Sequence, residues 1–249
     1  MCHKPIIIEE DAIFIADSHH NSLYQNTLDS IFTELLESKK RQIFLMGDIF
    51  DFLVGLVPQS LKDNQHTLEL LKQLSLKHQV YYLEGNHDFL LKEIPTFENI
   101  SYFPLNAQPI LCQFNNKNAY LAHGDILLSW HYKIFSKIIR NKFFIIFLNF
   151  FSNFLYPKII YFLQNKNIKK KKQESYFYQN FINFAQMRVE KYQKRISIPN
   201  DSYVIEGHFH RGNCIKYQNI NYICLPFFAC KKKYFIVKCD DNCLTLKES

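Results

Sequence analysis

Five short polar motifs, each directly after an apolar run, constrain the fold of this chain more than any other feature of its sequence. They begin at Asp17, Gly47, Gly85, His123 and Gly207. Short apolar runs bounded by polar residues are typical of buried strands. Ligands bind beyond the carboxyl ends of the strands in open α/β sheets, so five motifs that are far apart in sequence are expected to meet at one site.

The N-terminal part of the chain alternates between predicted strands and predicted helices. Strands are expected at 12–16, 42–46 and 79–83, and helices are expected at 22–38 and 63–77, where apolar residues recur at helical spacing. Alternation of this kind predicts parallel strands.

After residue 96 the pattern predicts mostly strands, with one long interruption. Short strands are expected at 99–103, 109–114, 118–122, 202–206, 213–217, 221–225, 233–238 and 243–247. The interruption spans residues 126–199 and includes helical periodicity at 174–195. Because no Gly-, Pro- or Ser-rich linker divides the chain, we expect one domain over residues 1–249, with 126–199 as a helical, apolar and basic insertion within it.

The polar residues of the five motifs suit divalent metal ions. The candidate ligands are Asp17, His19, Asp48, Asn86, His123, His208 and His210. Carboxylate, carboxamide and imidazole groups together suit Mn, Fe or Zn better than Mg, which prefers oxygen ligands alone. In Asp17-x-His19 and in His208-x-His210, both side chains of the pair fall on the same side of an extended segment. Each pair can therefore approach one metal cluster.

The motifs D-x-H, G-D-x-x-D, G-N-H-D, H-G-D and G-H-x-H, in this order, resemble those of the calcineurin-like metallophosphoesterase superfamily, and the resemblance spans residues 13 to about 212. It implies an α+β fold in which a β-sandwich is flanked by helices. It also implies two metal positions that share Asp48. One would be held by Asp17, His19, Asp48 and His210, and the other by Asp48, Asn86, His123 and His208.

The same resemblance implies that His87 is a catalytic imidazole near the leaving oxygen and that Asp88 orients it. Asp51 and Asp125 are expected either to support the ligands or to cap turns. Two metal ions can activate a water molecule and bind the phosphoryl oxygens. An imidazole that protonates a leaving oxygen accelerates a reaction by about 10²–10⁴-fold.

The insertion contains an unusually apolar segment. Residues 143–163 read FFIIFLNFFSNFLYPKIIYFL, and Lys169–Lys172 follow them. A single membrane span is excluded, because His123 and His208 lie on either side of the segment and must reach the same metal. Apolar surface beside basic charge favours binding to an anionic membrane face, and the net charge of +7 suits an anionic partner. Ordinary buried core helices are the alternative.

A helical insertion between the H-G-D and G-H-x-H motifs resembles that of the UDP-2,3-diacylglucosamine pyrophosphatases of lipid A synthesis. This resemblance implies hydrolysis of a nucleotide-linked glycolipid to UMP and 2,3-diacylglucosamine 1-phosphate, with Mn²⁺, by a peripheral protein on the cytoplasmic face of the inner membrane. The best-known branch of those enzymes has Arg at the position of His87. Neither nucleic acid nor an obligate protein partner is expected. Candidates to contact the substrate phosphates are Arg140, Arg188, Lys191, Lys194 and Arg195.

Three other functions stay open at this point: a nuclease, a phosphatase acting on small molecules or proteins, and a non-catalytic scaffold whose apolar patch binds a partner. A nuclease needs an open basic groove, whereas the aromatic residues here form a nearly uncharged block. The short apolar run after Pro5 is followed by Glu9, Glu10 and Asp11 and does not fit a signal peptide. Seven Cys without C-x-x-C spacing indicate reduced thiols, so a cytoplasmic location is expected.

Overall fold

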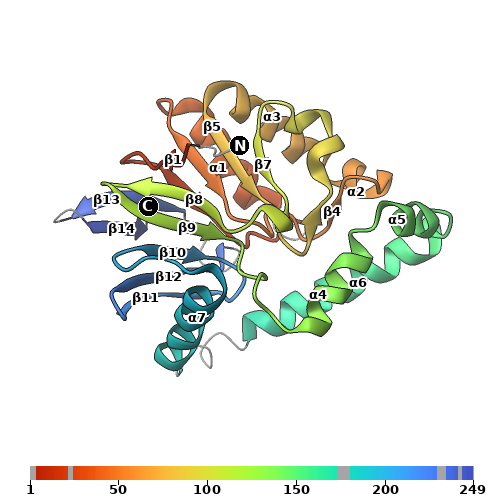
Figure 1. Cartoon of the computed structure of the whole chain (residues 1–249). Coiled ribbons are helices and arrows are strands. Elements are labelled where there is room, and N and C mark those ends of the chain that lie inside the picture. The colour runs from red at the N-terminus through yellow and green to blue at the C-terminus, as the bar shows by residue number, and fades with distance from the viewer. Residues whose placement is uncertain (1–3, 22–24, 173–179, 229–233, 241–242, 249) are drawn as a thin grey trace.

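A computed structural model describes residues 4–21, 25–172, 180–228, 234–240 and 243–248 of the chain. Two six-stranded sheets face one another as the layers of a sandwich (Figure 1). The first sheet contains, in spatial order, β1 (Ile6–Ile7), β8 (Ile110–Phe114), β9 (Lys117–Ala122), β10 (Tyr203–Glu206), β12 (Ile220–Pro226) and β11 (Arg211–Tyr217). The second contains β14 (Cys243–Glu248), β13 (Phe235–Asp240), β2 (Ile13–Ile15), β3 (Gln42–Leu45), β5 (Gln79–Leu83) and β7 (Ser101–Phe103). A small third sheet pairs β4 (Leu53–Val54) with β6 (Asp88–Phe89).

Helices cover both outer faces of the sandwich, and further helices extend away from it (Figure 1). The covering helices are α1 (Gln25–Glu37) and α3 (Gln65–Lys77) on the second sheet, and α7 (Phe181–Ile196) on the first. The extending helices, named here the helical arm, are α4 (Trp130–Ile139), α5 (Lys142–Asn149) and α6 (Ser152–Lys172). The shorter connecting helices are α2 (Pro58–Asp63) and the 3₁₀ turns at Leu91–Glu93, Pro95–Phe97 and Leu105–Ala107.

The central strands of the second sheet are apolar because both of their faces are covered. β2, β3 and β5 pair in parallel, with Ile13 opposite Ile43. Successive side chains of a strand point to opposite faces. Ile13 and Ile43 accordingly pack toward α1 and α3, whereas Phe14 and Phe44 stack between the two sheets with ring centroids 4.7 Å apart. Parallel strands buried in this way read as short continuous apolar runs.

The predicted fold class, an α+β sandwich flanked by helices, is confirmed. The strands predicted at 12–16, 42–46 and 79–83 coincide with β2, β3 and β5 to within one residue at each end. The predicted helix 174–195 corresponds to α7, and residues 173–179 lie outside the described residues.

The apolar segment 143–163 forms two helices of the arm rather than one. Many of its side chains face solvent, including Phe143 and Phe150, which are 83% and 82% exposed. Among the described residues, no single helix has both the length and the apolar composition needed to cross a membrane. α5 and residues Ser152–Leu163 of α6 meet both criteria only as a pair, and they are bent by 107° relative to each other.

Candidate metal centre

The predicted ligands follow strands whose carboxyl ends meet at one end of the sandwich. Asp17, Asp48 and Asn86 follow β2, β3 and β5 of the second sheet, while His123 and His208 follow β9 and β10 of the first. Because parallel strands end on the same side, both sheets deliver their polar loops to one place. The structure therefore brings together residues from all five sequence motifs.

Backbone hydrogen bonds connect these loops directly. The Asp17 N–H donates to Gly47 O at 3.1 Å, and the His208 N–H donates to the Asp17 carboxylate at 2.8 Å. Two glycines permit the close approach. A Cβ atom on Gly47 would lie 2.5 Å from His123 Nδ1, and one on Gly85 would lie 2.3 Å from Asp48 Oδ1. Any larger residue at either position would displace a candidate ligand.

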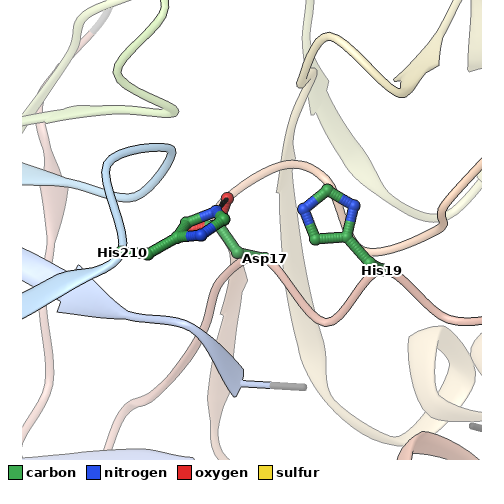
Figure 2. Close-up of side chains that lie close together, drawn as sticks. All are labelled: Asp17, His19 and His210. Carbon is green, nitrogen blue, oxygen red and sulfur yellow. Dashed lines mark hydrogen bonds and ion pairs between the residues drawn. The ribbon is translucent and has the colours of Figure 1, made fainter. Parts of the chain in front are cut away.

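Asp17, His19 and His210 form the first of two neighbouring clusters of predicted ligands, with ligand atoms within 4.8 Å of one another, and His19, Asp48 and His87 meet the same criterion as a third, overlapping group. His210 Nε2 lies 3.0 Å from Asp17 Oδ1. Figure 2 shows the Asp17 side chain between the rings of His210 and His19 in that view. His210 lies 193 residues after Asp17 in the sequence, so its proximity to the loop of Asp17 and His19 is a product of the fold.

Asp48, His123 and His208 form the second cluster, and Asn86 adjoins it. His123 Nε2 lies 3.2 Å from His208 Nδ1 and 3.4 Å from Asn86 Oδ1. Asp48 Oδ2 lies 3.5 Å from His123 Nε2 in this cluster and 3.8 Å from His19 Nε2 in the first. The Asp48 carboxylate therefore lies between the two clusters, as a ligand shared by two ions would.

The buried polar atoms of these clusters fit metal binding. Both ring nitrogens of His19 are buried, and neither makes a hydrogen bond to the described residues. His123 donates its Nδ1–H to Met46 O at 2.9 Å, which directs Nε2 toward Asp48 and fixes the tautomer that a ligand needs. Burial lowers the pKa of His19 to about 4 and that of His208 to about 3. Both rings are therefore neutral near pH 7, the form that binds divalent metals.

The backbone at the candidate ligands is strained. Asp17, His19, Asp48, His208 and His210 have φ angles of 55°, 43°, 51°, 59° and 56°. Few non-glycine residues adopt this left-handed region, although Asp and His do so more readily than most. Such strain costs on the order of 1–3 kcal/mol per residue and persists where the surrounding structure imposes it, commonly at functional sites.

The His87 imidazole is oriented by Asp51, which corrects the prediction that Asp88 orients it. His87 Nδ1 donates to Asp51 O at 2.7 Å and lies 3.6 Å from the Asp51 carboxylate. The same carboxylate lies 3.4 Å from His19 Nδ1. Asp51 therefore holds the His87 ring and lies close to the His19 ring, and among the described residues no hydrogen bond engages Nε2 of His87.

Asp88 instead organises the loop that carries Asp48. Its buried carboxylate accepts the N–H groups of Asp48, Ile49 and Gly85 at 3.0, 2.6 and 2.9 Å, and the Tyr82 hydroxyl at 2.6 Å. With these donors the carboxylate has little capacity left for the His87 ring. Asp88 is next to His87 in the sequence, but its carboxylate does not orient the His87 ring.

We expect Asp88→Ala to lower the free energy of unfolding by about 3 kcal/mol or more, because each buried donor left without an acceptor costs about 1–3 kcal/mol. Asp88→Asn is the matched control, since it keeps one acceptor oxygen and should cost less. Urea unfolding of chelator-treated protein measures both variants. A loss below about 1 kcal/mol for Asp88→Ala would show that these hydrogen bonds are not what holds the loop.

Two arginines that were predicted as candidates for substrate phosphates are committed to internal partners. Arg140 binds Glu84 and donates to Gly85 O at 2.8 Å, and Arg188 binds Glu206. Asp125 was expected either to support the ligands or to cap a turn. Its carboxylate accepts a hydrogen bond from the hydroxyl of Tyr132 on α4 at 2.9 Å, so it connects α4 to the loop after His123.

Sequence reasoning missed one aromatic neighbour of the first cluster. Phe227, which directly follows β12, stacks on the His210 ring with centroids 4.5 Å apart and rings 6° from parallel. The centroid of the Phe227 ring also lies 5.4 Å from that of the His19 ring, with the two rings 67° from parallel. No motif surrounds Phe227, so the sequence alone offers no signal for this contact.

An apolar cavity opens beside the second cluster. It has a volume of about 310 Å³ and reaches from Asn86 and His87 into the helical arm. Val54, Val57 and Phe89 line it from the body of the protein. The arm contributes Tyr132, Phe135, Ile139, Phe144, Ile145, Leu148, Asn149, Ser152, Leu155, Tyr156, Ile159 and Leu163. The predicted metal centre and a largely apolar cavity are therefore continuous.

Comparison with known proteins identifies a family and several similar chains. Residues 12–212 match the family model described as calcineurin-like phosphoesterase. The UDP-2,3-diacylglucosamine hydrolase of Aromatoleum aromaticum is 30% identical over 135 residues, which cover 52% of this chain and 54% of that protein. The protein of the same name from Haemophilus ducreyi is 32% identical over 46% of this chain and 49% of its own length. Vacuolar Protein Sorting 29 from Cryptosporidium parvum aligns over 96% of this chain and 95% of its own, with a TM-score of 0.43 and 12% identity. The chain thus matches about half the length of these curated relatives.

Proposed function

Since the chain belongs to the calcineurin-like phosphoesterase family, and is therefore a metal-dependent hydrolase, we propose that it hydrolyses UDP-2,3-diacylglucosamine to UMP and 2,3-diacylglucosamine 1-phosphate. One water molecule is consumed, and one P–O bond of the pyrophosphate breaks. The relatives named above carry this substrate in their names and support the choice.

The observation that carries this proposal is the apolar cavity beside His87. A hydrolase of small phosphate esters has no need of such a space, whereas an acyl chain gains about 0.8 kcal/mol for each CH₂ group that it buries. Because the cavity begins at Asn86 and His87, a lipid held in it would place its phosphates beside the two clusters.

The proposed metal set is Asp17, His19, Asp48, Asn86, His123, His208 and His210, as the sequence predicted. Mixed carboxylate, carboxamide and imidazole ligands favour Mn²⁺ over Mg²⁺ as the bound ion. When bound, two such ions activate water and neutralise the phosphoryl oxygens. His87 is the proposed acid, because its Nδ1–H is held by Asp51 O while Nε2 can protonate the leaving oxygen.

We further propose that the helical arm rests on an anionic membrane face from the cytoplasmic side. Its exposed apolar side chains include Phe147 and Phe154, and the exposed Lys158 lies among them, whereas Lys142 pairs with Glu93. This pairing of apolar and basic surface favours interfacial binding. The predicted lysine run Lys169–Lys172 ends α6, and its side chains lie outside the part that the structure describes.

A first test measures UMP release from UDP-2,3-diacylglucosamine by the full chain with Mn²⁺ and detergent, with bis(p-nitrophenyl) phosphate as a small substrate. We expect UMP release by the wild type. Leu155→Asp, which puts a carboxylate into the cavity, should lower kcat/KM for the lipid roughly tenfold or more, because an unpaired charge is costly there. Hydrolysis of the small substrate should change by less than about twofold, because the metal centre is untouched.

Leu76→Asp is the matched control, since Leu76 is exposed on α3 and does not line the cavity. It should leave both activities unchanged. Hydrolysis of the small substrate without UMP release would reject the lipid substrate and keep the metal-dependent hydrolase. Equal losses on both substrates for Leu155→Asp would reject the role of the cavity.

A further inference from the structure

Arg188, which is buried, and Arg140, whose side chain is 12% exposed, join α7 and α4 to the loops of the metal centre. Arg188 of α7 is 1% exposed, and its partner Glu206, the last residue of β10, is fully buried. Arg140 directly follows α4 and pairs with Glu84, which lies two residues before Asn86. Buried charges are rare and expensive unless they are paired, so both pairs require an explanation.

Arg188 connects two ligand loops to each other. Its Nε donates to Glu206 at 3.0 Å, and its Nη2 donates to Gly124 O and Ile126 O at 3.2 Å each. Gly124 follows the candidate ligand His123, and Glu206 lies two residues before His208. Tyr192 and Tyr222 donate to the same Glu206 carboxylate at 2.7 and 2.9 Å, which fixes it further.

Arg140 holds a third ligand loop in a similar way. Its Nη2 donates to Gly85 O at 2.8 Å, and the same nitrogen lies 3.8 Å from the Asp125 carboxylate. The Glu84 carboxylate also accepts the Tyr102 hydroxyl. Arg140 thereby connects the loop of Asn86 to the loop of His123.

Arg140 holds loops that supply only the second cluster, whereas the loop after Glu206, which Arg188 holds, carries both His208 of the second cluster and His210 of the first. Asn86, His123 and His208 are the residues that surround Asp48 on one side. Asp17 and His19 come from a loop that is held differently, by hydrogen bonds from Asp17 N–H to Gly47 O and from His19 N–H to Asp48 O at 2.9 Å. Among the described residues, no hydrogen bond or ion pair joins either guanidinium to that loop.

We propose that Arg140 is a positioning residue that sets the affinity of the metal position formed by Asp48, Asn86, His123 and His208 alone, whereas Arg188 supports this position and also the one formed by Asp17, His19, Asp48 and His210, because His208 and His210 share one loop. The inference rests on the proposed two-metal assignment. Partners that orient ligands from outside typically contribute 10–100-fold to metal affinity. The planar guanidinium fork is required, because a lysine cannot bind a carboxylate and a carbonyl in the same geometry.

The test is a Mn²⁺ titration of the chelator-treated full chain, followed by the electron paramagnetic resonance signal of free Mn²⁺. The wild type should bind two ions per chain. Arg140→Lys should weaken one binding step by about 10–100-fold and leave the other within about twofold, whereas Arg188→Lys should weaken both steps. Arg195→Lys is the matched control, since Arg195 is an exposed arginine of α7. Thermal unfolding without metal shows whether each variant is folded.

Two ligand variants identify the affected position. In a His19→Ala background, which retains the Asp48–Asn86–His123–His208 position, Arg140→Lys should still weaken Mn²⁺ binding by about 10–100-fold. In a His208→Ala background Arg140→Lys should leave the remaining affinity unchanged. Arg140→Gln repeats the test if Arg140→Lys does not fold.

A folded Arg140→Lys variant with wild-type affinities, or with equal weakening of both steps, would overturn the inference. Failure of the wild type to bind two ions would instead reject the two-metal assignment itself. Neither result depends on the lipid substrate, so this test and the test of the proposed function can fail separately.

Discussion

Asp48→Asn is expected to lower hydrolysis of every phosphoester substrate by roughly 10³-fold or more. The Asp48 carboxylate lies between the two clusters, 3.5 Å from His123 Nε2 and 3.8 Å from His19 Nε2. Asn keeps the size of the side chain and loses its charge, so the substitution weakens both positions at once. Losing one preorganised electrostatic group already lowers the rate by about 10²–10³-fold in many enzymes. Asp48→Asn would weaken two metal positions at once, so a larger loss is expected.

The measurement combines kcat on bis(p-nitrophenyl) phosphate with the Mn²⁺ content of the purified variant. Asp201→Asn serves as the matched control, because Asp201 pairs with Lys117 at the surface, away from the clusters. Asp48→Asn protein that keeps two Mn²⁺ ions and activity within about tenfold of the wild type would contradict a shared ligand at this position.

His87→Ala is expected to lower kcat by about 10²–10⁴-fold, the range for loss of a general acid, while both Mn²⁺ ions stay bound. The reason is geometric, since Asp51 O holds Nδ1 of the ring at 2.7 Å and the ring lines the entrance of the apolar cavity. A variant that loses activity but keeps both Mn²⁺ ions has lost a general acid, whereas a variant of a metal ligand would lose an ion as well.

A series of aryl phosphodiesters with leaving groups of increasing pKa tests the role more sharply. If His87 protonates the leaving oxygen, the rate of the wild type should depend weakly on the leaving group and that of His87→Ala steeply. His66→Ala, at an exposed histidine of α3, is the control. Parallel dependences for wild type and variant would mean that His87 acts by binding rather than by proton transfer.

The sequence could predict that the candidate ligands lie together, because they follow strands and strand ends are evident in the pattern. Asp17, Asp48 and Asn86 could be placed together without coordinates, since parallel neighbouring strands end at the same edge. The arrangement of the two sheets, which brings His123 and His208 to the same edge, was available only through family resemblance.

What the sequence could not predict depends on side-chain direction and on long-range contacts. Asp88 follows His87 directly, yet its carboxylate turns toward the Asp48 loop. Arg140 and Arg188 are basic residues of an insertion, where exposure is the usual expectation. Their burial depends on Glu84 and Glu206, which lie 56 and 18 residues away in sequence. The two-residue strands β1, β4 and β6 are too short to leave any periodic pattern.

The apolar segment 143–163 does not bend at its proline, as the sequence alone would suggest. A proline commonly ends or kinks a helix because it lacks an N–H group. Here Pro157 lies inside α6, and the 107° bend falls between Asn149 and Ser152. Asn149 donates to Leu56 O at 2.6 Å and Gln59 donates to Ser152 at 3.1 Å, so tertiary contacts with the body coincide with the turn.

The left-handed backbone at Asp17, His19, Asp48, His208 and His210 has an evolutionary consequence. Glycine adopts this conformation without strain, so a lineage released from selection for metal chemistry could replace these residues and gain stability from the very substitutions that end catalysis. Selection for activity must therefore oppose selection for stability at the same codons. In descendants that keep the sandwich for another purpose, substitutions should accumulate first in these loops, while the buried strands that carry them stay unchanged.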